Sequence, residues 1–161
     1  MGLSEAILEL ENRNVGDNWE PTLGPALALA LAEWRSGSRD RELRLHLLFL
    51  SWYCNVEPPH LTGLDEALRS SLDLPSVFHT IYDTFADGIL EDPECLFIVG
   101  LMASLTPWLL GGDVHEWESR SIVFREHYRA LLPHGLPPAY FDGRGAYGDY
   151  FAGQVVVPGG F

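Results

Sequence analysis

The amino-acid sequence predicts an all-α protein, a single-domain irregular bundle of about six helices with a C-terminal loop rich in glycine and aromatic residues. Three observations predict this fold class. Apolar residues recur at the three- and four-residue spacing of helices along most of the chain. Proline, glycine and aspartate stand where such helices would begin and end. Strand-like sequence is nearly absent until the three valines at residues 155–157.

The length and composition favour one compact domain. The chain has 161 residues, of which 47% are hydrophobic and 20% are charged, as is ordinary for a globular protein. A chain of this length buries about 70% of the surface that its unfolded form exposes. We divide the domain into an N-terminal arm and loop at residues 1–24, a helical core at 25–135 and a Gly/Tyr-rich C-terminal segment at 136–161.

The first third of the chain predicts three helices. Residues 1–11 alternate small, apolar and acidic groups, which is typical of a short amphipathic helix. A loop follows, and Pro25 then suits the first turn of a second helix, which runs to Trp34. Asp40 fits the N-cap of a third helix at residues 41–54, whose nearly continuous apolar side chains indicate an enclosed position.

The middle of the chain predicts a turn and two clear helices. Two consecutive prolines mark the turn, and a weak helix at residues 64–72 follows it. Pro75 opens an amphipathic helix with its apolar residues on one face. The sequence Asp92-Pro93-Glu94 combines an N-cap aspartate, a first-turn proline and an early carboxylate. The helix that it begins is apolar on all sides and should form the centre of the core.

A capping box predicts the start of the last clear helix. Asp113 and Glu116 have the required spacing, with the Glu116 side chain reaching back to the Asp113 backbone. Apolar residues then recur at roughly helical spacing, and Gly135 lies beyond the end of the helix.

The C-terminal segment contains the most unusual local sequence. Residues 139–151 include five aromatic residues, three glycines, two aspartates and one arginine. Arg144 stands between Asp142 and Asp149 and could fix a turn through a bidentate pair. We interpret the segment as a structural lid over the core; the alternative is a contact for a ligand or partner, in which Arg144 and Tyr147 are the candidate binding residues.

The charge is concentrated in one part of the chain. Ten arginines, no lysines and 23 carboxylates give a net charge of −13 at pH 7. Residues 57–118 contain twelve acidic residues and one base, Arg69, and so carry −11 of that charge. Such a stretch creates a field that attracts cations or basic partners. Direct nucleic-acid binding is not expected, because it relies on clustered Lys and Arg.

Acidic residues at a spacing of four are the main candidate site. Asp83, Asp87 and Glu91 would line one stripe of the helix that begins at Pro75, and Asp92 and Glu94 extend the charge. Like charges at this spacing destabilise a helix, by about 0.4–1 kcal/mol for the two pairs together. The stripe is either a solvated face with arginine partners supplied by the fold or a docking surface for a basic protein. A metal site fits less well, because calcium sites use looped geometry.

Sequence motifs for catalysis and cofactor binding are missing. The chain has no zinc-protease motif, no phosphate-binding loop, no dinucleotide-binding fingerprint and no nucleophile elbow. We therefore expect no catalytic residue, metal or cofactor. The alternative is a small-molecule or metal-dependent enzyme that uses Glu57, His60 and either His115 or Asp142.

The sequence indicates a cytoplasmic protein. The N-terminus lacks the basic and apolar regions of a secretory signal. The longest apolar stretch, residues 95–110, is interrupted by polar residues and proline and is too short to span a bilayer. Cys54 and Cys95 both lie in apolar runs and are expected to be free, buried thiols. The absence of lysine beside abundant Ala, Leu, Gly, Pro and Arg suggests a GC-rich, bacterial coding sequence.

In overall character, the chain resembles the small acidic immunity proteins of bacterial toxin systems. The resemblance lies in the acidic cluster from Asp83 to Glu94, the helical body and the missing catalytic motifs. It implies a protein that binds a cognate toxin and blocks its active site, with carboxylates set against a basic cleft. A self-associating helical module and an acidic decoy for a DNA-binding protein remain alternatives, and the oligomeric state is open.

Overall fold

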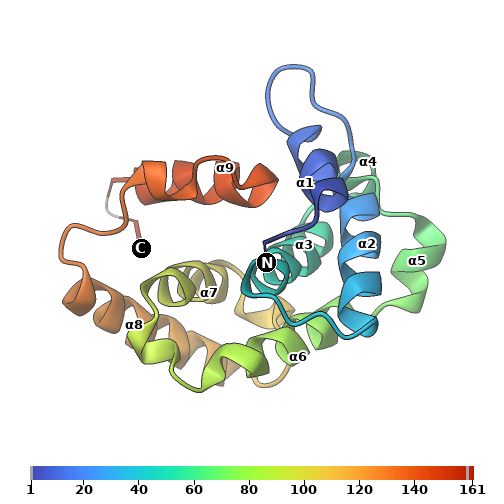
Figure 1. Ribbon diagram of the computed structural model, residues 1–161. Helices are drawn as coiled ribbons and strands as arrows, with labels where there is room; N and C mark the ends of the chain where they lie inside the picture. The colour runs from blue at the N-terminus through green and yellow to red at the C-terminus, as the bar shows by residue number, and fades with distance from the viewer. Residues whose placement is uncertain (1, 159) are drawn as a thin grey trace.

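The computed structural model describes residues 2–158 and 160–161, and within them the chain forms nine α-helices, three short 3₁₀ helices and no strand (Figure 1). This confirms the all-α prediction, although the helices outnumber the six expected. The α-helices are α1 (Glu5–Asn12), α2 (Leu23–Arg35), α3 (Arg41–Val56), α4 (Pro59–Thr62), α5 (Glu66–Ser71), α6 (Leu74–Ala86), α7 (Pro93–Leu105), α8 (Val114–Leu131) and α9 (Gly145–Val155). The 3₁₀ helices are η1 (Ile89–Glu91), η2 (Pro107–Leu109) and η3 (Pro138–Phe141).

Helix α7 lies at the centre of the core. Ten of its thirteen residues are buried, as its continuous apolar sequence predicts. It packs along α8, and the ring of Phe97 in α7 contacts Phe151 in α9 at a centroid distance of 6.1 Å. Figure 1 shows α7 between α9 on one side and α8 on the other. Helix α3, the second enclosed helix, packs against α2 and α6.

Aspartate caps begin two of the helices as predicted. The Asp92 carboxylate accepts a hydrogen bond of 3.1 Å from the amide of Cys95 at the start of α7. The Asp113 carboxylate accepts one of 2.8 Å from a first-turn amide of α8. The prediction that the Glu116 side chain reaches back to the Asp113 backbone is wrong, however. The Glu116 carboxylate instead accepts a hydrogen bond of 3.4 Å from Arg120, one turn later.

The predicted acidic stripe does not lie on one helix. Helix α6 ends at Ala86, Asp87 follows in extended backbone, and Gly88 adopts the left-handed conformation with φ of 83°. Glycine adopts this conformation without the steric cost that a side chain adds. Asp83 therefore lies in α6 and Glu91 in η1, with a turn between them.

The C-terminal loop prediction is wrong, because residues 145–155 form helix α9. Its glycines lower helix propensity, which is why the sequence favours a loop. One of them allows tight packing instead: a Cβ on Gly148 would lie 2.2 Å from the Phe141 carbonyl oxygen in η3. Tyr147 and Phe151 are fully buried. The valines at residues 155–157 end the helix and form no strand.

Among the residues that the structure describes, no helix combines the length and apolar character needed to cross a bilayer.

Helix α1 is not a detached arm, because it packs against both α2 and α9. The first and last helices of the fold therefore lie against each other, as Figure 1 shows.

Candidate functional site

Three of the five predicted acidic contact residues are exposed. Asp83 in α6 has a side chain that is 62% exposed, and its Oδ1 lies 3.6 Å from Nε2 of His79. Asp87 and Glu91 are also exposed, and neither forms an ion pair with any residue that the structure describes. We call Asp83, Asp87 and Glu91 the acidic edge.

The other two acidic residues are neutralised inside the fold, which corrects their predicted role as open partner contacts. Arg41 makes a bidentate pair with Asp92, at 2.7 and 3.0 Å, and also lies 3.4 Å from Oε1 of Glu94. Burial raises the pKa of Asp92, but hydrogen bonds from Arg41 and the Cys95 amide outweigh it and hold that pKa below its usual value. The Glu94 side chain is only 3% exposed and is closed to a surface partner.

A cluster of charged and polar side chains lies inside the helical body, where α1, α3, α7 and the start of α9 meet. We call it the buried polar cluster, and its members are Glu11, Glu42, His46, Glu94, Arg144 and Tyr147. Buried polar groups lose their hydration and need partners within the protein. The contacts of this cluster supply them.

His46 is the positive centre of one half of the cluster. Its Nδ1 lies 2.5 Å from Oε2 of Glu11 and its Nε2 lies 3.2 Å from Oε2 of Glu42. Burial alone lowers the pKa of His46, but the two carboxylates outweigh it and raise that pKa to about 9. His46 is therefore charged at neutral pH. The Glu11 carboxylate also accepts a hydrogen bond of 3.1 Å from the Tyr147 amide.

Glu94 is the centre of the other half. Its carboxylate lies 2.7 Å from Nη2 of Arg144 and accepts hydrogen bonds from the hydroxyls of Tyr147 at 2.5 Å and Tyr140 at 2.9 Å. Burial raises the pKa of Tyr147 well above its usual value, and the Glu94 charge adds to that effect. Tyr147 is therefore a neutral hydrogen-bond donor to the Glu94 carboxylate.

Arg144 and Tyr147 are placed differently from the prediction. Arg144 forms no ion pair with Asp142 or Asp149 among the described residues; its guanidinium instead bonds to Glu42 and Glu94 of the cluster. Tyr147 is fully buried, so its predicted contact with a surface partner is corrected too. The cluster neutralises charge within the fold and joins elements far apart in sequence.

Glu11, Glu42 and His46 were not predicted as site residues. A signal for His46 was present, because a histidine within the apolar run of α3 must find hydrogen-bond partners when it is buried. Nothing in the sequence identifies Glu11 as one of those partners, since 35 residues separate it from His46.

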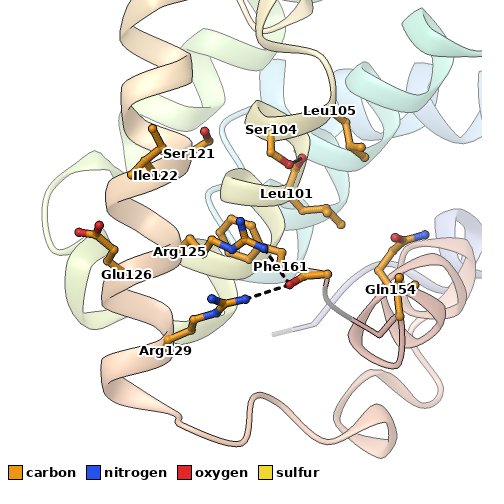
Figure 2. Close-up of a pocket in the computed structure, with 12 residues that line it drawn as sticks. Leu101, Ser104, Leu105, Ser121, Ile122, Arg125, Glu126, Arg129, Gln154 and Phe161 are labelled. Atoms are coloured by element: carbon orange, nitrogen blue, oxygen red, sulfur yellow. Dashed lines mark hydrogen bonds between the residues drawn. The ribbon is translucent and has the colours of Figure 1, made fainter.

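A groove lies between α7, α8 and the C-terminal residues, with a volume of about 490 Å³ (Figure 2). Its apolar wall consists of Leu101, Leu105, Ile122, Val157 and Phe161. Arg125 and Arg129 of α8 extend toward the C-terminal residues, and each donates a hydrogen bond to the carbonyl oxygen of Gly160, at 3.0 and 3.1 Å. None of the predicted site residues lines this groove.

The residues of the predicted enzyme alternative are not gathered into a metal site. His60 lies in α4 and His115 in the first turn of α8, where its side chain is 89% exposed. No cluster of three metal-ligating side chains occurs among the described residues. Cys54 and Cys95 are free and buried, as predicted, and burial raises the pKa of Cys54 to about 12.

Comparison of the chain with protein-family models, with curated proteins and with solved structures gave no match.

Proposed function

We propose that this protein binds a basic protein partner through the acidic edge. The observation that carries the proposal is that Asp83, Asp87 and Glu91 are exposed and have no arginine partner among the described residues. Because α6 ends at Ala86, Asp83 lies in its last turn, Asp87 directly after it and Glu91 in η1, and all three are at the surface. A net charge of −13 supports electrostatic attraction of such a partner.

Two arginines of α3 approach this edge without neutralising it. Arg41 is occupied by Asp92 and Glu94. Arg44 lies over the ring of Phe85 and donates a hydrogen bond to the hydroxyl of Thr84. It adds one positive charge beside three negative ones, so the edge keeps a negative balance.

Neutralisation of a toxin is the particular form of this function that the resemblance to immunity proteins supports. Exposed carboxylates can cover a basic cleft, and close charge pairs across such an interface couple by about 1.5–7 kcal/mol. The acidic charge would also raise the association rate at low salt. The cytoplasmic location and the bacterial origin belong to the same proposal.

The test compares two triple variants with equal changes of charge. Asp83→Asn, Asp87→Asn and Glu91→Gln remove the acidic edge. The matched control, with Glu5→Gln, Glu9→Gln and Asp17→Asn, removes three exposed carboxylates near the N-terminus. Proteins captured at low salt by the wild type and by both variants are identified by mass spectrometry, and association rates are then measured at several salt concentrations.

We expect a basic partner that the wild type and the control capture and that the edge variant loses. Association with that partner should slow as salt rises, while dissociation changes little. Capture of the same partner by the edge variant, with an unchanged association rate and salt dependence, would show that the partner binds elsewhere.

A further inference from the structure

Two arginines in the groove between α7 and α8 lack a carboxylate partner in the part of the chain that the structure describes. Four other arginines of this acidic protein, Arg13, Arg41, Arg120 and Arg144, each form an ion pair with a carboxylate. Arg125 and Arg129 instead donate to the same neutral oxygen, the carbonyl of Gly160. Their positive charges are therefore not compensated by any described ion pair.

The geometry around Gly160 suits an anionic oxygen better than a carbonyl. Two guanidinium groups converge on one point, at 3.0 and 3.1 Å from the oxygen. In a guanidinium–carbonyl bond only the donor is charged, whereas a carboxylate acceptor adds a second charge and matches the paired N–H groups of guanidinium. Arg125 is also incompletely satisfied, because its Nε is buried without a hydrogen-bond partner in the described residues.

The nearest carboxylate along the helix does not supply the missing charge. Glu126 lines the same groove, but Figure 2 shows its carboxylate directed away from Phe161, while Arg125 and Arg129 are directed toward it. Glu126 forms no described ion pair with either arginine.

The surface next to the arginines is apolar. Leu101 and Leu105 of α7, Ile122 of α8 and Val157 near the C-terminus all line the groove. Leu105 and Ile122 are among the most exposed large apolar side chains described. A volume of about 490 Å³ lies within the range of small-molecule sites, about 300–1,000 Å³.

We propose that this groove binds a small carboxylate that carries an apolar chain. The carboxylate competes with the Gly160 carbonyl for the guanidinium groups of Arg125 and Arg129, so Gly160 must shift when it binds. The apolar chain lies along Leu105 and Ile122. Inorganic phosphate or acetate would satisfy the arginines but would leave the apolar walls bare. The proposal is independent of the acidic edge, which lies on α6 and η1.

The test uses decanoate below its micelle concentration as the probe and isothermal titration calorimetry as the readout. Decanol has the same chain without the charge, and acetate has the charge without the chain. Arg125→Gln and Arg129→Gln each remove one guanidinium group. Arg35→Gln is the matched control, because Arg35 is exposed in α2 and forms no ion pair among the described residues.

We expect saturable binding of one decanoate by the wild type and by Arg35→Gln, with decanol and acetate at least tenfold weaker. Each groove variant should weaken decanoate binding about tenfold, as the loss of a hydrogen bond to a charged group implies. Equal binding of decanoate and decanol by the wild type would overturn the proposal without any variant. Unchanged decanoate affinity in both groove variants would also overturn it, since only adsorption to apolar surface would explain that result, and so would the absence of saturable binding.

Discussion

Titration of His46 provides the sharpest test of the buried polar cluster. The pKa of His46 is about 9 in the folded protein, whereas an unfolded chain has the ordinary value of about 6.5. Because the pKa of His46 is higher in the folded state, protonation of its ring stabilises the folded protein. This contribution to the free energy of unfolding is fully present below pH 6.5 and is lost as the pH rises through 9. The difference corresponds to roughly 3 kcal/mol of unfolding free energy. The cause is that deprotonation leaves the buried carboxylate of Glu11 beside a neutral ring.

The assay is urea denaturation at several pH values between 6 and 9, followed by circular dichroism. The free energy of unfolding of the wild type should fall by roughly 3 kcal/mol over this range. His46→Asn keeps a hydrogen-bond donor near Glu11 but cannot titrate, so the fall should be much smaller in that variant. The reasoning would be refuted if the free energy of unfolding of His46→Asn fell with pH as steeply as that of the wild type. It would also be refuted if the free energy of unfolding of the wild type changed by less than about 1 kcal/mol over this range.

Three further predictions concern the interior. Glu94→Gln should lower the free energy of unfolding by about 1–3 kcal/mol, because it removes the buried charge that pairs with Arg144 and accepts from two tyrosine hydroxyls, while Arg144 keeps Glu42 as a partner; denaturant titration measures this. Gly148→Ala should lower the free energy of unfolding by about 1–3 kcal/mol, because the added Cβ clashes with the Phe141 carbonyl oxygen. In the same helix, a Cβ on Gly153 would have no other atom within 4 Å, so Gly153→Ala should raise the free energy of unfolding by about 1 kcal/mol. Melting curves of the two variants show whether packing explains the difference. The thiol of Cys95, fully buried and with a raised pKa, should react with a thiol reagent only when the protein unfolds, so labelling as fast as that of a free thiol would contradict its burial.

Local chemistry allowed much of the fold to be predicted. Asp92 caps α7 and Asp113 caps α8 because an N-cap needs only a side chain and the next turn. The apolar sequence of α7 likewise determines its central position. The limits of α6 were harder to predict, because the left-handed turn at Gly88 ends a periodicity that continues in the sequence.

Contacts between distant residues explain what the sequence did not predict. Arg144 has two aspartates nearby in the sequence, yet it bonds to Glu42, which is 102 residues away. Helix α9 forms against its own glycine-rich composition, because Gly148 fits closely under η3 and Tyr147 fills the core. Such pairings depend on how the helices pack, and neither spacing nor composition encodes them in a form that can be read from one sequence.

The hydrogen bond from the Tyr147 amide to Glu11 spans 136 residues and has a consequence for biosynthesis. When only the first helices have left the ribosome, the nascent chain already contains Glu11 and His46. Tyr147, which contacts both of them in the folded protein, has not yet been made. Completion of the fold must therefore wait for the last helix, and chain closure of this kind slows folding. Ribosome-bound chains that stop before residue 144 should remain open to proteases at α1, whereas chains released beyond α9 should be protected.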